Sequence, residues 1–185
     1  MSFGSFTAKV LRTSRMSRFA HAGAAMLVVS AYGAVFGRKL LERGSPERLL
    51  ALQLHYLLGI LVLLWSLAWL LWRSAESANP RGPQQRPPLQ RAAARAVHAT
   101  LFVFLVVQPS LGIVSKMARS RGIDLPRAWG VIPSLVERNP RLANTVQDLH
   151  VLLGTSVCVL IGLHVAAAGW HWYAARRIPA PGHRE

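Results

Sequence analysis

The sequence predicts an all-α integral membrane protein, folded as a four-helix bundle. Just over half of its 185 residues are hydrophobic, although the net charge is +15. The charged residues are segregated, which leaves four runs without any Asp, Glu, Lys or Arg. Each run has 19 to 24 residues, close to the roughly 20 that a helix needs to cross a bilayer. The predicted spans are residues 19–37, 49–72, 96–114 and 149–170.

The first span follows a basic segment, residues 1–17, which we predict to be a cytoplasmic tail. A basic start and an apolar run also occur in signal peptides. This run is 19 residues long and holds His21 near its beginning, so we expect a retained helix. The four spans then form one transmembrane domain, residues 18–177, followed by a second tail, residues 178–185.

The connections between the later spans differ in composition. The segment "NPRGPQQRPPLQR" (Asn79–Arg91) is rich in Pro and Gln without apolar periodicity, which predicts a loop. The connection from Ser115 to Asp148 mixes Trp129 and several aliphatic residues with prolines and charges. That composition suits a short element in the membrane interface. In the third span, Pro109 beside Gln108 is expected to kink the helix and free a carbonyl.

Four spans place both termini on one side of the membrane. That side carries 12 of the 22 Lys and Arg residues, a bias that favours cytoplasmic termini. The arginines stand beside the spans, as in many membrane proteins, so the basic charge is assigned to lipid contact and not to nucleic-acid binding.

Every predicted span carries at least one histidine. The five are His21, His55, His98, His150 and His164. Ionisable groups inside a membrane are unfavourable and usually mark a functional site that faces the bundle interior. A single histidine of this kind can equally well be bonded to a neighbouring helix. Recurrence in all four spans favours a site.

Helical geometry sorts these histidines by depth. His150 and His164 are fourteen residues apart, which is about 21 Å of rise and nearly four whole turns, so both lie on one helix face. With cytoplasmic termini, His150 is at the outer depth and His164 at the inner depth. His21 matches the inner depth and His55 the outer one. The predicted pairs are therefore His21 with His164 and His55 with His150, facing across the interior of the bundle.

Paired imidazoles in an apolar interior favour haem over a bare metal ion. Zn²⁺ normally takes four ligands, often including Cys or a carboxylate, whereas haem iron needs only two axial ligands. A small residue follows each paired histidine by four positions, on the same helix face; these are Ala25, Gly59, Gly154 and Ala168. We predict two haems inside the bundle. Iron with two imidazoles has no open position, which favours electron transfer.

The chain resembles, over all four spans and essentially from Ser17 to Arg177, the bacterial cytochrome b561 family, which includes the b-type membrane subunits of nickel–iron hydrogenases. The matching stretches are "LHYLLGILVLLWSLAWLLWR", "AVHATLFVFLVVQPSLG" and "LHVLLGTSVCVLIGLHVAAAGWHW". The last holds two histidines fourteen apart and a third seven beyond. The resemblance implies a di-haem b cytochrome of the bacterial inner membrane, with His21, His55, His150 and His164 as axial ligands. It also implies electron exchange with quinone, and in some members superoxide oxidation at the outer face.

For the remaining histidines and the basic residues of the third connection, two roles each stay open. His98 either contacts a haem propionate or quinone, or bonds to a neighbouring helix. His171 departs from the family, where two histidines are often adjacent, because Trp172 follows it; an interfacial anchor is the simpler role. Four basic residues are either partners of outer haem propionates or of an anionic substrate, or solvated charges. They are Lys116, Arg119, Arg121 and Arg127.

Three functions are compatible with these features. The first is a free-standing carrier of electrons between an outer donor, such as superoxide, and the quinone pool. The second is a haem-bearing anchor of a larger dehydrogenase or hydrogenase, with a redox partner subunit. The third is a transporter that uses its histidines as a metal or proton relay. The absorbance spectrum separates the third from the others, and co-purification separates the first two.

Overall fold

The computed structural model describes residues 3–75, 88–120, 122–126 and 129–177; the side chains of residues 3–14 and of a few others lie outside this description. The long helices are α1 (Phe3–Gly37), α2 (Pro46–Ala75), α3 (Pro88–Arg119) and α4 (Pro140–Arg177). All four are long and apolar enough to cross a membrane. The predicted all-α bundle of four membrane helices is therefore confirmed.

Helix starts fall outside the apolar runs, because local capping fixes them. Helices α2, α3 and α4 each begin at a proline, a residue favoured in the first turn because its missing N–H has no partner there. The Ser45 hydroxyl accepts from the Arg48 N–H at 3.2 Å, and the Asn139 side chain accepts from the Leu142 N–H at 3.0 Å. These are N-cap bonds, and they start α2 and α4 several residues before the uncharged runs.

Two segments that the sequence predicts as non-helical are partly helical in the structure. Helix α1 begins at Phe3, so it includes most of the segment predicted as a basic tail. Helix α3 begins at Pro88, so the last four residues of the predicted Asn79–Arg91 loop are helical. The rest of that predicted loop lies outside the described residues.

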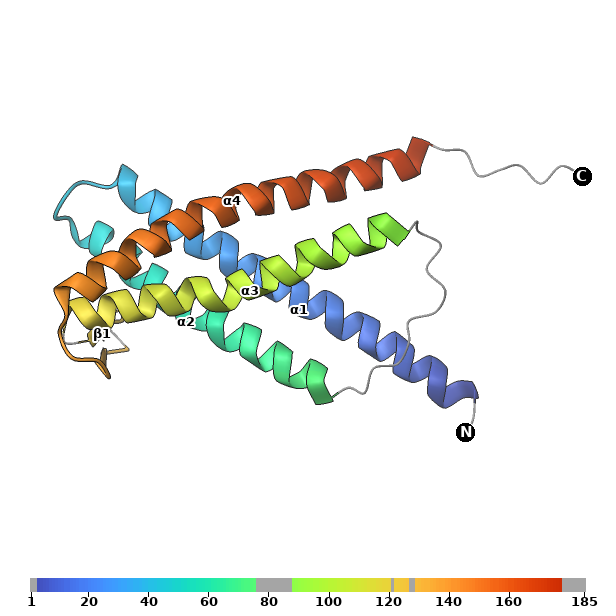
Figure 1. Ribbon diagram of the computed structural model, residues 1–185, viewed down its shortest axis with the longest axis horizontal. Helices are drawn as coiled ribbons and strands as arrows, with labels where there is room; N and C mark the ends of the chain where they lie inside the picture. The colour runs from blue at the N-terminus through green and yellow to red at the C-terminus, as the bar shows by residue number, and fades with distance from the viewer. Residues whose placement is uncertain (1–2, 76–87, 121, 127–128, 178–185) are drawn as a thin grey trace, which may run out of the picture.

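The four helices run lengthwise through the molecule (Figure 1) and pack mainly as two pairs. The backbone of α1 packs along α2, that of α3 along α4, and α2 also packs on α3. Within the described residues, α4 makes few close backbone contacts with α1 or α2. We call the end with the start of α1 and the last turns of α4 the terminal end, and the opposite end, with the two short strands, the hairpin end.

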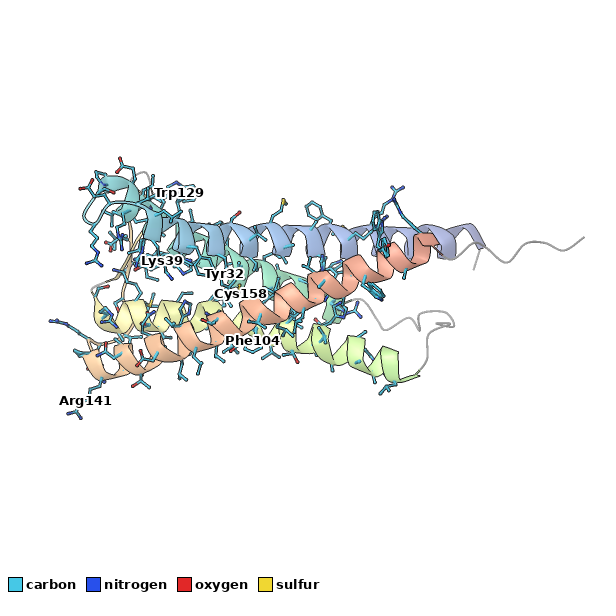
Figure 2. The ribbon with its side chains drawn as sticks, turned by 90° about the horizontal axis from the view of Figure 1, so that it is seen from above. Tyr32, Lys39, Phe104, Trp129, Arg141 and Cys158 are labelled. Carbon is cyan, nitrogen blue, oxygen red and sulfur yellow. The ribbon has the colours of Figure 1, made fainter. Side chains whose placement is uncertain are left out.

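At the hairpin end, the connection predicted as an interfacial element forms an antiparallel β-hairpin. Strand β1 (Gly122–Asp124) pairs with β2 (Val131–Pro133). Ile123 is 2% exposed, and a Cβ on Gly122 would collide with the Ile132 carbonyl. Lys116 pairs with Asp124 at 3.0 Å and fixes the hairpin to α3. Trp129 stays exposed at this end (Figure 2), in agreement with contact to the membrane interface.

Side chains join the helices along the bundle. The Trp65 ring on α2 fits against Gly23 of α1, and its Nε1 donates to the Ala20 carbonyl at 3.0 Å. The Tyr32 hydroxyl of α1 donates to the Gly154 carbonyl of α4 at 2.6 Å. Most of the remaining helix surface is apolar and exposed, as expected where lipid is the solvent.

Candidate functional site

The structure brings four of the five span histidines together as two facing pairs. The His21 ring of α1 lies 6.2 Å from the His164 ring of α4, centroid to centroid. The His55 ring of α2 lies 6.2 Å from the His150 ring, also on α4. We call His21 and His164 the terminal pair, and His55 and His150 the hairpin pair. These are the partners that their depths predict.

Both pairs bridge helices whose backbones stay apart. Each joins α4 to α1 or α2, and these are the helices with few close backbone contacts in the described residues. The rings therefore meet across the space between the α1–α2 layer and the α3–α4 layer. One face of α4 supplies a ring at each of two levels, because fourteen residues are nearly four whole turns.

Backbone carbonyls orient the hairpin pair. His55 Nδ1 lies 2.9 Å from the Ala31 carbonyl oxygen, and His150 Nδ1 lies 3.0 Å from the Gln108 carbonyl oxygen. A carbonyl only accepts hydrogen bonds, so each Nδ1 carries the proton and each Nε2 keeps its lone pair for a ligand. Histidines that bind metals are commonly held in this way. The rings of the terminal pair have no such bond to any residue that the structure describes.

His98 lies beside the terminal pair. Its ring is 5.3 Å from the His164 ring, at an interplanar angle of 83°. Its Nδ1 bonds the Ala94 carbonyl of its own helix at 2.6 Å, and its Nε2 has no hydrogen bond to any described residue. His171 belongs to α4, but its side chain lies outside the described residues.

The small residues near the paired histidines have two different surroundings. A Cβ on Gly59 would meet nothing within 4 Å, and Ala25 and Ala168 are exposed. Space is therefore left beside three of the four histidines. A Cβ on Gly154 would instead lie 2.7 Å from Gln108 Nε2. Gly154 is small because α3 approaches it.

The basic residues at the hairpin end are partly engaged in the fold. Lys116 pairs with Asp124 and lies 5.5 Å from the centre of the Tyr56 ring. Arg119 Nη2 donates to the Asn144 side chain at 2.9 Å. Arg121 and Arg127 lie outside the described residues. The Nε of Arg38, which directly follows α1, is buried without a partner among the described residues.

The sequence predicts a kink at Gln108 and Pro109 but does not indicate the contacts of Gln108 or the burial of the Arg38 Nε. Gln108 contacts His150 through both its backbone and its side chain. The available signal for Gln108 was its polarity inside an apolar span, since polar groups there need a partner. No sequence pattern shows which partner it has.

Comparison with known families identifies the chain. The family model described as prokaryotic cytochrome b561 matches residues 12–180. The match includes all four apolar spans and all five span histidines, and it agrees with the resemblance carried by the histidine spacing. Members are membrane proteins of electron transfer that carry haem b. The chain therefore belongs to the prokaryotic cytochrome b561 family.

Proposed function

We propose that the chain is a di-haem b cytochrome that transfers electrons across the bilayer, between a donor on the outer side and the quinone pool. The terminal pair would hold one haem, and the hairpin pair would hold the other. The observation that carries this proposal is the equal separation of the two pairs, at two levels along one face of α4.

The ring separation fits a metal held between two imidazoles. An imidazole nitrogen binds a first-row metal at about 2.0–2.1 Å, so two rings on opposite sides of one metal have centroids roughly 6 to 6.5 Å apart. Both pairs are at 6.2 Å. His98 and His164, at 5.3 Å, are too close to share a metal in this arrangement. Among the described residues, no group of three or more His, Cys, Asp or Glu is arranged to hold a metal ion.

The surrounding residues support a flat apolar group between the layers. Gly59 and the exposed Ala25 and Ala168 leave room next to three of the rings. The hairpin pair is oriented with Nε2 available. A haem held by these imidazoles would supply one-electron redox chemistry. The chain's own residues bind the group, orient it and keep water away from it.

Orientation and location complete the proposal. The excess of Lys and Arg on the side of the termini supports a cytoplasmic terminal end in a bacterial inner membrane. The hairpin end then faces outward, where the donor is oxidised. Superoxide is a candidate donor because positive charge attracts small anions, and Arg38 at this end has a buried Nε without a hydrogen-bond partner among the described residues.

The haem content of the purified protein tests the proposal. We expect two b-type haems per chain in protein extracted with a mild detergent, with sharp bands on reduction. Both should be removed by acidified acetone, because the chain has a single cysteine and so lacks the Cys-x-x-Cys-His motif that attaches haem covalently. One haem per intact chain would contradict the two-pair arrangement. A subunit that co-purifies in a fixed ratio would favour the anchor function over a free-standing carrier.

His98 gives a second test, because it touches the terminal pair without being needed as a ligand. We expect His98→Ala to keep both haems and to shift the potential of the terminal-end haem, or to slow electron exchange with quinol about tenfold, the lower range for residues next to metal ligands. Redox titration and stopped-flow reduction by a quinol measure these effects. Phe102→Leu, one turn further along α3, serves as the control.

The outcomes for His98→Ala exclude one another. If the variant loses the terminal-end haem, His98 is a ligand and the role of His164 has to be revised. If potential and quinol kinetics equal those of the unmodified protein, His98 only packs against His164.

A further inference from the structure

Gln108 and His150 are joined by two hydrogen bonds that run in opposite directions between α3 and α4. The Gln108 side-chain Nε2 donates to the His150 backbone carbonyl at 2.7 Å. The His150 ring Nδ1 donates to the Gln108 backbone carbonyl at 3.0 Å. The first bond fixes the backbone of α4 at residue 150, and the second fixes the rotation of the ring. Together they determine where Nε2 points.

The Gln108 carbonyl that lies against the His150 ring directly precedes a proline. Pro109 lies inside α3, where it has no N–H to donate to the Leu105 carbonyl one turn earlier. The Ser110 hydroxyl donates to the Val106 carbonyl at 2.7 Å, as hydroxyl groups do near kinks in membrane helices. The carbonyl directly before the proline accepts from the other helix.

Two glycines provide the space for this contact. A Cβ on Gly112 would lie 2.9 Å from His150 Cε1 and 3.2 Å from its Nδ1. A Cβ on Gly154 would lie 2.7 Å from Gln108 Nε2. Any side chain at position 112 therefore has to displace the ring, and any at position 154 has to displace the amide.

The hydrogen bonding of the Gln108 amide indicates why a polar residue stands at this position. Gln108 Oε1 is buried and has no hydrogen-bond partner among the described residues. A buried acceptor without a partner is unfavourable, and more so in a membrane. An apolar side chain would avoid this penalty. The Nε2 bond to His150 is the contact that an apolar side chain would lose.

We propose that the α3 segment Gln108–Gly112 is a positioning element for His150, and that it sets the reduction potential of the hairpin-end haem separately from that of the terminal-end haem. The inference rests on the proposed function, since it assumes that His150 is an axial ligand. A ligand histidine whose Nδ1–H is hydrogen-bonded is more basic, which favours the oxidised iron and lowers the potential. The rings of the terminal pair have no such bond to a described residue.

Gly112→Ala tests the positioning element, and Gly162→Ala is its matched control. Alanine is the better helix former, and a Cβ at position 162 meets nothing within 4 Å, so the control changes composition without a collision. In holoprotein with Gly112→Ala, we expect the hairpin-end haem to rise in potential or to bind about tenfold more weakly. The terminal-end haem should stay unchanged. Potentiometric titration and low-temperature electron paramagnetic resonance resolve the two haems, and His55→Ala identifies the hairpin-end signals.

Gln108→Leu provides a second measurement if Gly112→Ala does not fold. It removes the Nε2 donor and the unpaired Oε1 but keeps the backbone carbonyl, so the same haem should shift in the same direction by a smaller amount. Gln108→Asn keeps an amide, but its shorter side chain does not reach the His150 carbonyl, so it should behave like leucine.

The results distinguish a failure of this inference from a failure of the proposed function. If the unmodified protein holds two haems and neither Gly112→Ala nor Gln108→Leu alters the hairpin-end haem, the positioning role is wrong. A shift confined to the terminal-end haem also overturns it. If the unmodified protein holds fewer than two haems, or if His55→Ala removes both, the proposed function itself is wrong.

Discussion

Replacing His55 or His150 with alanine is expected to remove one and the same haem, and replacing His21 or His164 is expected to remove the other. The reason is the geometry of the two pairs, in which the partners are 6.2 Å apart and belong to different helices. Loss of one axial ligand leaves iron with a single imidazole in an apolar interior, which we expect to lower haem affinity far beyond the 10- to 100-fold typical of outer-shell partners.

The experiment compares haem content and redox titration for the four single variants. Each should retain about one haem per chain, and the potentials of the remaining haems should form two groups. His183→Ala, in the second tail, is the control and should retain both haems. A crossed grouping, with His21 and His150 affecting the same haem, would contradict the pairing by depth.

The second large effect is expected in transmembrane electron transfer. Protein reconstituted in vesicles that contain ferricyanide should reduce it when a membrane-impermeant reductant is added outside. Replacing one histidine of either pair, by His150→Ala or His164→Ala, should lower this transfer to the level of vesicles without protein. The two levels are fourteen residues apart on α4, which is about 21 Å of helix, so one remaining haem leaves most of the membrane uncrossed.

Gly162→Ala is the matched control for this measurement, because it lies on α4 in open space and should transfer electrons at the unmodified rate. Haem content has to be measured on the same vesicles. A variant that holds one haem and still reduces the enclosed ferricyanide at the full rate would show that transfer does not need both levels.

The sequence predicts the bundle and the meeting of the paired rings well, for simple physical reasons. Charged side chains are energetically unfavourable inside a bilayer, so membrane spans stand out in the sequence as runs without charged residues. A helix converts sequence separation into depth, so His150 and His164 define two levels. The structure brings together the rings matched in this way, while their role as haem ligands stays a prediction.

The remaining features depend on contacts between distant residues. The partners of Gln108 and Tyr32 lie 42 and 122 residues away, and no local pattern specifies them. The β-hairpin has strands of only three residues, too short for an alternating pattern. The starts of α2 and α4, in contrast, have local signals in the sequence. Ser45 followed by Pro46 and Asn139 followed by Pro140 are recognisable capping patterns.

The participation of α4 in both pairs has a consequence for biosynthesis. His21 and His55 leave the ribosome early, but each faces a partner on the last helix to be made. A nascent chain that ends before residue 150 has no complete pair, and one that ends between residues 150 and 164 has only the hairpin pair. If the pairs hold the cofactors as proposed, the hairpin pair can be loaded only after residue 150 is in place, and the terminal pair only after residue 164. Among the described residues, α4 makes few close backbone contacts with α1 and α2, so a cofactor bound as proposed would also hold the two halves of the bundle together.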